Sequence, residues 1–153
     1  MITTDGPYVL EYNVRFGDPE AQAVLPRLKT DLVEIMLAAC EERLKQVKMK
    51  WEKKSCVCVV MCSGGYPGKY PVGKEIKGLE AAKGADTIVF HAGTKKVNDK
   101  IVTSGGRVLG VTALGQNIEE AIQKAYTAVE QIKFDHQFFR RDIGAKALKK
   151  INV

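Results

Sequence analysis

The segment SCVCVVMC (residues 55–62) carries the clearest secondary-structure signal in this 153-residue chain. It is rich in valine, whose β-branched side chain favours the extended backbone of a strand. Successive side chains of a strand point to opposite faces, so Cys56, Cys58 and Cys62 share one face. The segment therefore predicts a β-strand that carries its cysteines as buried, reduced thiols.

The same cysteines raise the alternatives of a metal site or a disulfide framework. The chain has four cysteines and two histidines. Along a strand the three thiols spread over ~20 Å, which is too far to surround one tetrahedral ion. A zinc site would need a closely spaced pair such as C-x2-C and a second pair elsewhere. We expect free thiols rather than metal ligands.

Downstream of this strand, short apolar segments are separated by glycines and turn residues. A tight turn is expected at Asn98–Asp99, and Asn117 with Glu120 predicts the cap of a helix over residues 117–133. A short terminal helix should follow Gly144. Several strands with hairpin turns, packed with one helix, predict an α+β architecture containing a small mixed β-sheet or barrel-like unit. The segments with strand or turn character are SGGYPGKYPVG (63–73), KEIKGL (74–79), DTIVFHAGT (86–94) and KIVTSGGRVLGVTALG (100–115).

Upstream of residue 55 the pattern changes. MITT (1–4), turn residues and YVLEYN (8–13) predict a β-hairpin, and a helical stretch is expected from about Pro19 with an interruption near Pro26. A second helix should open at Thr30 or Asp31 and run to about Val47. Its apolar residues recur at spacings of three and four, which predicts one buried stripe: Leu32, Ile35, Met36, Ala39, Cys40 and Leu44.

The basic stretch at residues 48–54 predicts a boundary, which divides the chain into residues 1–50 and 51–153. The net charge is +6, and the lysines near this boundary suit a solvated helix end. The aromatic residues are not spaced like a base-stacking platform, so we expect no nucleic-acid partner. No apolar stretch approaches the ~20 residues that span a bilayer, and residues 1–6 do not resemble a signal peptide. We expect a cytoplasmic protein with no membrane partner.

The decapeptide EYNVRFGDPE (11–20) is unusually polar for a strand that leads into a helix. On an extended backbone Glu11 and Asn13 project from one face ~7 Å apart, with Arg15 next in register. Carboxylate and carboxamide oxygens suit Mg2+, which keeps waters and shares phosphate oxygens. Arg15 could hold a phosphoryl group by paired hydrogen bonds. A polar strand edge with a cross-strand ion pair explains the same residues equally well.

A resemblance to a known family favours the metal-site interpretation. Residues 9–34, VLEYNVRFGDPEAQAVLPRLKTDLVE, resemble the last strand and following helices of the ATP-grasp domain of the phosphoribosylamine–glycine ligase (glycinamide ribonucleotide synthetase) family. The resemblance extends over residues 1–149. It implies the end of an ATP-grasp domain followed by a small mixed-sheet domain packed with a helix. The segments that resemble the family's C-terminal domain, in matching order, are SGGYPGKYPVGKEIKGL, VFHAGT, SGGRVLGVTALG and FRRDIGAKAL.

The resemblance implies an ATP-dependent carbon–nitrogen ligase of purine biosynthesis, which joins glycine to 5-phospho-D-ribosylamine through glycyl phosphate. Carried over by motif, Glu11 and Asn13 match two ligands of Mg2+ (or Mn2+). Arg15 matches a catalytic residue that stabilises charge on the transferred group. Asp18 and Glu20 match positions that recognise substrate or orient Arg15.

Arg107 follows two glycines, whose small size permits close approach of a ligand. We expect it to contribute to substrate binding, for example by reaching a phosphate across the boundary between the two parts of the chain.

The family's Rossmann-like N-terminal domain and the ATP-binding part of its ATP-grasp domain have no counterpart in these residues. We therefore expect a C-terminal fragment that is inactive alone and whose partner is the missing N-terminal part of the same protein. A non-catalytic binding or scaffold module with the same architecture is the alternative. A hairpin without neighbouring strands exposes a pairing edge, so we also expect self-association through residues 1–13.

Overall fold

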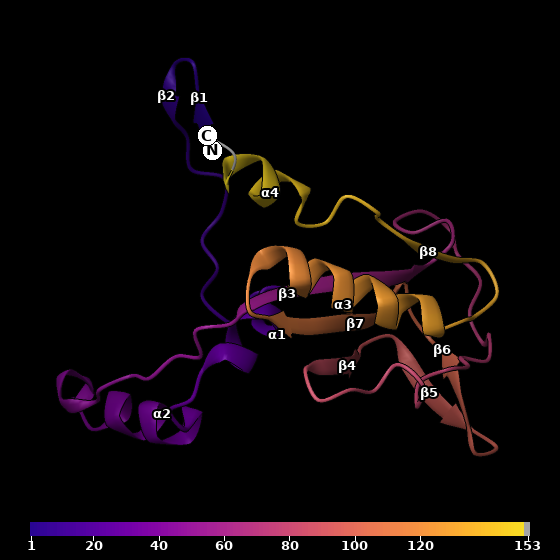
Figure 1. The fold of residues 1–153 in the computed structure, drawn as a ribbon, viewed down its shortest axis with the longest axis horizontal. Coiled ribbons are helices and arrows are strands. Elements are labelled where there is room, and N and C mark those ends of the chain that lie inside the picture. Colours follow the sequence, from indigo (N-terminus) through magenta and orange to yellow (C-terminus); the bar gives the residue numbers. More distant parts are fainter. Residues whose placement is uncertain (152–153) are drawn as a thin grey trace.

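The computed structural model describes residues 1–151, with side-chain burial defined through residue 148. Its centre is a four-stranded sheet in the order β4-β7-β3-β8, in which every neighbouring pair is antiparallel (Figure 1). The strands are β3 (Ser55–Ser63), β4 (Thr87–His91), β7 (Arg107–Gly115) and β8 (Gln137–Phe139). The predicted α+β architecture is confirmed, and the strand expected at residues 55–62 is β3.

β3 and β7 form the longest pair of the sheet. Their register runs from Ser55 opposite Gly115 to Met61 opposite Leu109 and then shifts, so that Cys62 faces Arg107. A bulge of this kind re-aims the side chains beyond it. The shift therefore sets the direction of Arg107 at the start of β7.

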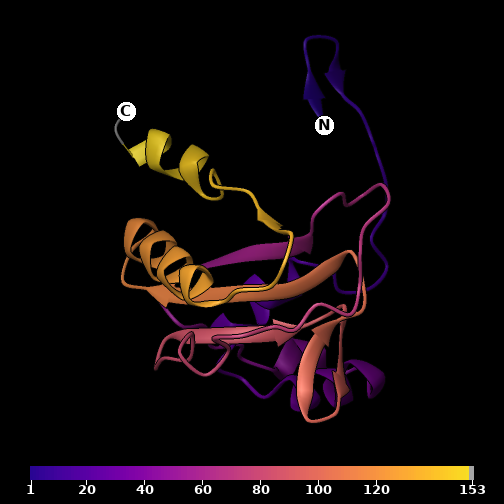
Figure 2. The same cartoon turned by 90° about the vertical axis from the view of Figure 1, so that its right-hand side faces the viewer.

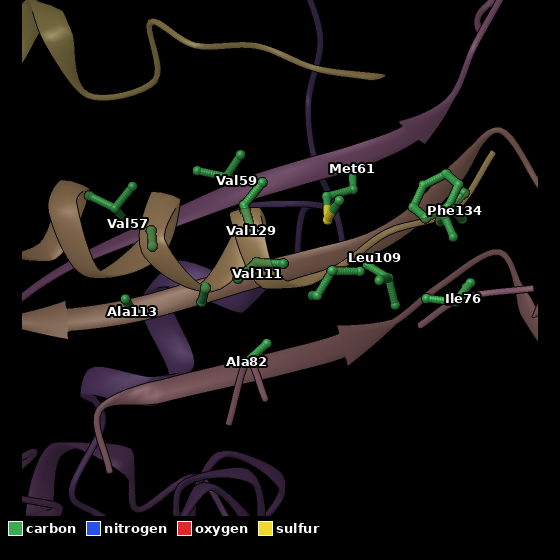
Figure 3. Close-up of a cluster of buried hydrophobic side chains, with 14 of the residues drawn as sticks. Val57, Val59, Met61, Ile76, Ala82, Leu109, Val111, Ala113, Val129 and Phe134 are labelled. Atoms are coloured by element: carbon green, nitrogen blue, oxygen red, sulfur yellow. The ribbon is translucent and has the colours of Figure 1, made fainter. Parts of the chain in front are cut away.

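One helix, α3 (Ile118–Gln131), covers one face of this pair. Asn117 caps it by accepting a hydrogen bond from the Glu120 backbone N–H at 2.9 Å, and the Glu120 carboxylate accepts one from the Gln116 N–H at 2.6 Å. The helix expected at 117–133 is confirmed with an end at Gln131. Buried residues of β3, β7, α3 and the flanking loops form the core (Figure 3): Val57, Val59, Met61, Ile76, Ala82, Leu109, Val111, Ala113, Val129 and Phe134.

The predicted tight turn at Asn98–Asp99 connects β5 (Thr94–Val97) and β6 (Lys100–Thr103). Asn98 has φ 46° and Asp99 has φ 62°. Two consecutive residues in the left-handed region match the twist of a two-residue hairpin loop, and Asn and Asp tolerate that region better than most residues.

The strand expected in KEIKGL (74–79) is wrong. Only isolated bridges form there, from Glu75 to Val102 and from Lys77 to Lys133. Gly73 has φ 78° and Gly78 has φ 81°, so the extended run between them is too short for a ladder. Side chains at Gly78 are also excluded, because a Cβ there would lie 1.9 Å from the Gln131 carbonyl oxygen.

The N-terminal hairpin is shorter than expected. β1 (Ile2–Thr3) pairs with β2 (Gly6–Pro7), but residues 8–13 form no strand. Beyond β2, the hairpin is extended only by mutual hydrogen bonds between the main chains of Met1 and Tyr8. Hydrogen bonds to neighbouring strands hold a strand in register, and no other strand lies beside this hairpin in the described chain (Figures 1 and 2).

Short helices follow this segment. α1 (Ala21–Val24) and a 3-10 turn over Leu25–Arg27 match the helical stretch predicted to break near Pro26. α1 lies against the face of β3 and β7 opposite to α3. α2 (Leu32–Cys40) begins at Asp31, which caps it by accepting a hydrogen bond from the Val33 N–H at 2.8 Å.

The predicted buried stripe of the second helix is wrong in this chain. α2 ends at Cys40, a 3-10 turn follows at Leu44–Gln46, and of the helix only Ala38 is buried. Met36 is 48% exposed, and α2 projects away from the sheet (Figure 1). Periodicity identifies residues that share a face, but burial of that face also needs a second surface. Within residues 1–151, no helix is long and apolar enough to cross a membrane.

An ion network centred on Asp86 connects the start of β4 with the start of β3 and with α3. Asp86, just before β4, accepts hydrogen bonds from Lys54, just before β3, and from Lys124 of α3 at 2.8 Å. These two bonds lower the pKa of Asp86 from 3.8 to about 2. Lys124 also pairs with Glu120 of the same helix at 2.8 Å. Its bond to Asp86 ties the first turns of α3 to the start of β4.

Leu109→Ala should lower the free energy of unfolding by about 2–5 kcal/mol, because Leu109 is fully buried and the change leaves a cavity. Urea denaturation followed by circular dichroism measures this. Val97→Ala in the exposed part of β5 is the control, with an expected change below about 0.5 kcal/mol. Equal losses in the two variants would contradict the assignment of the core.

The Asp86 network predicts an acid-sensitive contribution to stability. Because the folded pKa of Asp86 is depressed, its contribution is present above pH 4 and is lost as pH falls from about 4 towards 2. Asp86→Asn should therefore be less stable than the parent at pH 7 and lose less stability between pH 4 and pH 2. Thermal unfolding across this range tests it, with Asp99→Asn in the exposed turn as control. Parallel pH curves for the parent and Asp86→Asn would refute the role of the network.

Candidate functional site

Residues 8–16, here called the arm, connect the N-terminal hairpin to the turn before α1. Three of its side chains form a hydrogen-bonded row. The Asn13 carboxamide donates to the Glu11 carboxylate at 3.2 Å, and the Arg15 guanidinium donates to the Asn13 carboxamide oxygen at 2.7 Å. The alternate positions 11, 13 and 15 thus lie on one side, although the backbone there belongs to no sheet.

The row contains donor types that a divalent cation takes. Glu11 and Asn13 carry exposed hard-oxygen donors that suit Mg2+ or Mn2+, but here the Asn13 nitrogen faces Glu11 and the Asn13 oxygen is bonded to Arg15. Within residues 1–151, no group of three or more His, Cys, Asp or Glu side chains is arranged to hold a metal ion. A bound cation would therefore take its other ligands from water or phosphate, as Mg2+ commonly does.

Arg15 lies where it can serve the same ligand. Its guanidinium also donates to the main-chain oxygen of Phe16 at 3.3 Å, and its side chain is exposed. A guanidinium beside two oxygen donors can hold a phosphate oxygen while the donors hold the cation that phosphate shares. A metal–polyphosphate ligand would need Arg15 to exchange its bond to the Asn13 oxygen for one to phosphate.

Asp18 and Arg107, separated by 89 positions, lie in direct contact. Arg107 pairs with the Asp18 carboxylate at 2.9 Å and donates to the Asp18 main-chain oxygen at 3.1 Å. The Asp18 side chain is 48% exposed and the Arg107 side chain is 42% exposed. The structure thus brings together two of the residues expected to bind substrate, and it pairs them with each other.

Gln22 is a residue of this cluster that sequence reasoning missed. Its carboxamide donates to the second oxygen of the Asp18 carboxylate at 2.7 Å. The available signal was its spacing of four from Asp18 at the start of a helical segment, where such pairs meet. Glu20 lies at the first turn of α1, and its carboxylate occupies the space over Gly17, where a Cβ would lie 2.5 Å from the carboxylate oxygen.

The cysteines of β3 face α1, not the core. All four cysteines of the chain are free. The expected burial is wrong: Cys40 is exposed, and Cys56, Cys58 and Cys62 are half-buried, because the short helix α1 covers only part of their face. Partial burial raises the pKa of Cys56 to about 11 and also raises the pKa values of Cys58 and Cys62.

Comparison with known families finds a match to "Phosphoribosylglycinamide synthetase, C domain" over residues 56–146. Among curated proteins, the chain is 54% identical over 145 residues to the phosphoribosylamine–glycine ligase of Caldanaerobacter subterraneus and 49% identical over 152 residues to that of Escherichia coli. These alignments cover 95% and 98% of this chain but 34% and 35% of the relatives. The chain thus spans about a third of the length of the curated relatives it matches.

A solved structure of the phosphoribosylamine–glycine ligase from Thermotoga maritima is also similar. It superposes with a TM-score of 0.71 at 35% sequence identity, over 93% of this chain and 34% of that structure. The architecture described above is therefore one that the larger enzyme contains.

Thiol chemistry offers a direct test of the β3 face. At pH 7.5 iodoacetamide should modify Cys40 first and Cys56, Cys58 and Cys62 much more slowly, because only the thiolate reacts and partial burial disfavours it. Mass spectrometry of timed samples gives the order. Cys40→Ser should remove the fast phase, and a fast phase that persists in that variant would show that the β3 thiols are accessible and ionised.

Proposed function

Since the chain belongs to the phosphoribosylglycinamide synthetase, C domain, family, we propose that it is the C-terminal part of a cytoplasmic phosphoribosylamine–glycine ligase. The complete enzyme would join glycine to 5-phospho-D-ribosylamine at the expense of ATP, giving glycinamide ribonucleotide, ADP and phosphate. The names and the high identity of the relatives support this reaction. The partner of the chain would be the remaining N-terminal part of the same protein.

Two parts of the chain would serve two parts of the enzyme. Residues 1–50 would complete the ATP-grasp domain, and residues 51–153 would form the C-terminal domain. The start of the family match at residue 56 supports this division. The exposed large apolar side chains support it too, because most of them lie in residues 1–50 and would be covered by the rest of an ATP-grasp domain. Until covered, the N-terminal hairpin would favour self-association.

The row of Glu11, Asn13 and Arg15 is the observation that carries the proposal. Glu11 and Asn13 would hold Mg2+ or Mn2+. When bound, the cation would screen the repulsion between ATP and the glycine carboxylate. Arg15 would leave the Asn13 oxygen and hold the transferred phosphoryl group.

The reaction needs this electrostatic arrangement because a carboxylate is a poor electrophile. Its oxygen would attack the terminal phosphorus of ATP, the bond to ADP would break, and glycyl phosphate would form. The amine of phosphoribosylamine would then attack the carbonyl carbon, lose a proton and expel phosphate. Arg15 would stabilise negative charge on the phosphoryl oxygens during the transfer. Asp18, Glu20 and Arg107 would orient Arg15 or recognise substrate.

Reconstitution tests the proposal. The chain alone should release no ADP, whereas mixing it with the N-terminal two-thirds of the Caldanaerobacter relative should give ADP release that depends on glycine and phosphoribosylamine. Glu11→Ala should lower this rate by roughly 100-fold or more, because it removes a ligand that acts in the transition state. A coupled ADP assay measures both results.

Glu119→Ala is the matched control, since Glu119 is an exposed carboxylate on α3 far in sequence from the arm. It should leave the reconstituted rate unchanged. Stable folding without activity in any mixture would favour the alternative, a non-catalytic binding or scaffold module. Full activity of Glu11→Ala would refute the metal site.

A further inference from the structure

Asp18 is held from two sides. One carboxylate oxygen accepts a hydrogen bond from Gln22 at 2.7 Å, and the other pairs with Arg107 at 2.9 Å. Arg107 uses a second nitrogen for the Asp18 main-chain oxygen at 3.1 Å, so it grips both the side chain and the backbone. Charge-assisted bonds to a forked guanidinium fix direction as well as distance.

Gln22 is itself anchored to the central strand. Its main-chain oxygen accepts a hydrogen bond at 3.0 Å from Thr112, which is fully buried in β7. Gly110 of the same strand lies beside the Gln22 side chain, since a Cβ there would be in ordinary contact, at 3.7 Å, with the Gln22 Cγ. β7 thus contacts the turn after the arm and α1 through three of its residues, Arg107, Gly110 and Thr112.

The bond to Asp18 leaves the other polar atom of the Gln22 carboxamide without a described partner. Its oxygen is buried without a hydrogen-bond partner among the described residues. An unpaired buried acceptor is unfavourable. The carboxamide keeps this orientation because its nitrogen, and not its oxygen, can donate the hydrogen bond that the Asp18 carboxylate oxygen accepts.

The arm, which precedes Asp18, has no comparable contacts with the sheet within the part of the chain that the structure describes. Each of its large hydrophobic side chains is more than half exposed, and the least exposed, Phe16, is still 53% exposed. The hydrogen bonds of Arg15 stay within the arm. The contacts at Asp18 are therefore the nearest tie between the arm and the sheet.

We propose that Asp18, Gln22 and Arg107 form a clamp. It positions the arm, and with it the row of Glu11, Asn13 and Arg15, relative to the four-stranded sheet. The role of the clamp in catalysis rests on the proposed ligase function, whereas its role in holding the arm does not. Gln22 is a positioning residue that acts through Asp18, and Thr112 holds Gln22. Displacing reacting groups by about 1 Å can cost about 100-fold in rate, so such a tie matters to an enzyme whose ligands come from an exposed arm.

Amide hydrogen exchange of the intact 153-residue chain tests the clamp without any activity. The reporters are the N–H groups of Ala21, Ala23 and Val24, which bond to Gly17 and Glu20 in the clamped turn. Gln22→Met and Arg107→Met should each speed their exchange about five- to tenfold, while buried amides of β3 and β7 keep their rates. The double variant should show less than the product of the two effects, because both act through Asp18.

Three comparisons make this result decisive. Gln22→Met removes the unpaired oxygen, so a residue that matters only for packing would leave protection of the turn unchanged or increased. Arg107→Lys should retain part of the protection, since a lysine can pair with the carboxylate but cannot form the fork. Gln123→Met, at an exposed position of α3, should change nothing. Unchanged exchange at Ala21, Ala23 and Val24, or equal acceleration throughout the sheet, overturns the clamp.

The reconstituted ligase gives the second readout. Gln22→Met should lower kcat about tenfold and leave KM for ATP and glycine unchanged, as expected for a group that positions catalytic residues without touching substrate. An unchanged kcat, or an effect on KM alone, overturns the positioning role. If no mixture shows ligase activity, the proposed function fails, but the exchange experiment still decides whether the clamp exists.

Discussion

The antiparallel pairing of β3 with β7 is the constraint on which the rest of the structure depends. It runs from Ser55 to Cys62 on one strand and from Arg107 to Gly115 on the other. One face of the pair receives α3 and forms the apolar core, and the other receives α1. Because side chains alternate along a strand, a single register decides both which valines are buried and which residues can contact α1. A slip by one residue would exchange the two faces.

β7 connects folding to the candidate site through this alternation. Leu109 and Val111 lie in the core, while Gly110 and Thr112 face α1. At the start of the strand the shift in register lets Arg107 reach Asp18. Residues that hold the arm therefore come from the most buried strand of the sheet. A rigid element gives more precise positioning than a loop does, which explains how an exposed arm can carry residues that must meet a ligand in defined geometry.

The helix α2 shows what periodicity can and cannot predict. The spacing of Leu32, Ile35 and Met36 correctly indicated a helix with an apolar side, and Asp31 caps it as a local hydrogen-bonding residue should. The same spacing wrongly predicted burial. Hydrophobic free energy is gained only when two surfaces meet, and the described chain supplies one of them. An apolar stripe that stays exposed is then consistent with the chain spanning a third of its relatives.

By itself the sequence determined the features that depend on near neighbours: the strand at β3, the turn at Asn98–Asp99, the cap of α3, and the placement of Glu11, Asn13 and Arg15 on one side. Backbone sterics and short-range hydrogen bonds act within a few residues, so their outcome is written in local spacing. Only the tertiary structure decided that Arg107 meets Asp18 across 89 positions, and that Gln22 completes the contact. Those pairings depend on the register of β3 and β7, its shift at Met61–Cys62 and the seating of α1, which arise from packing rather than from local pattern.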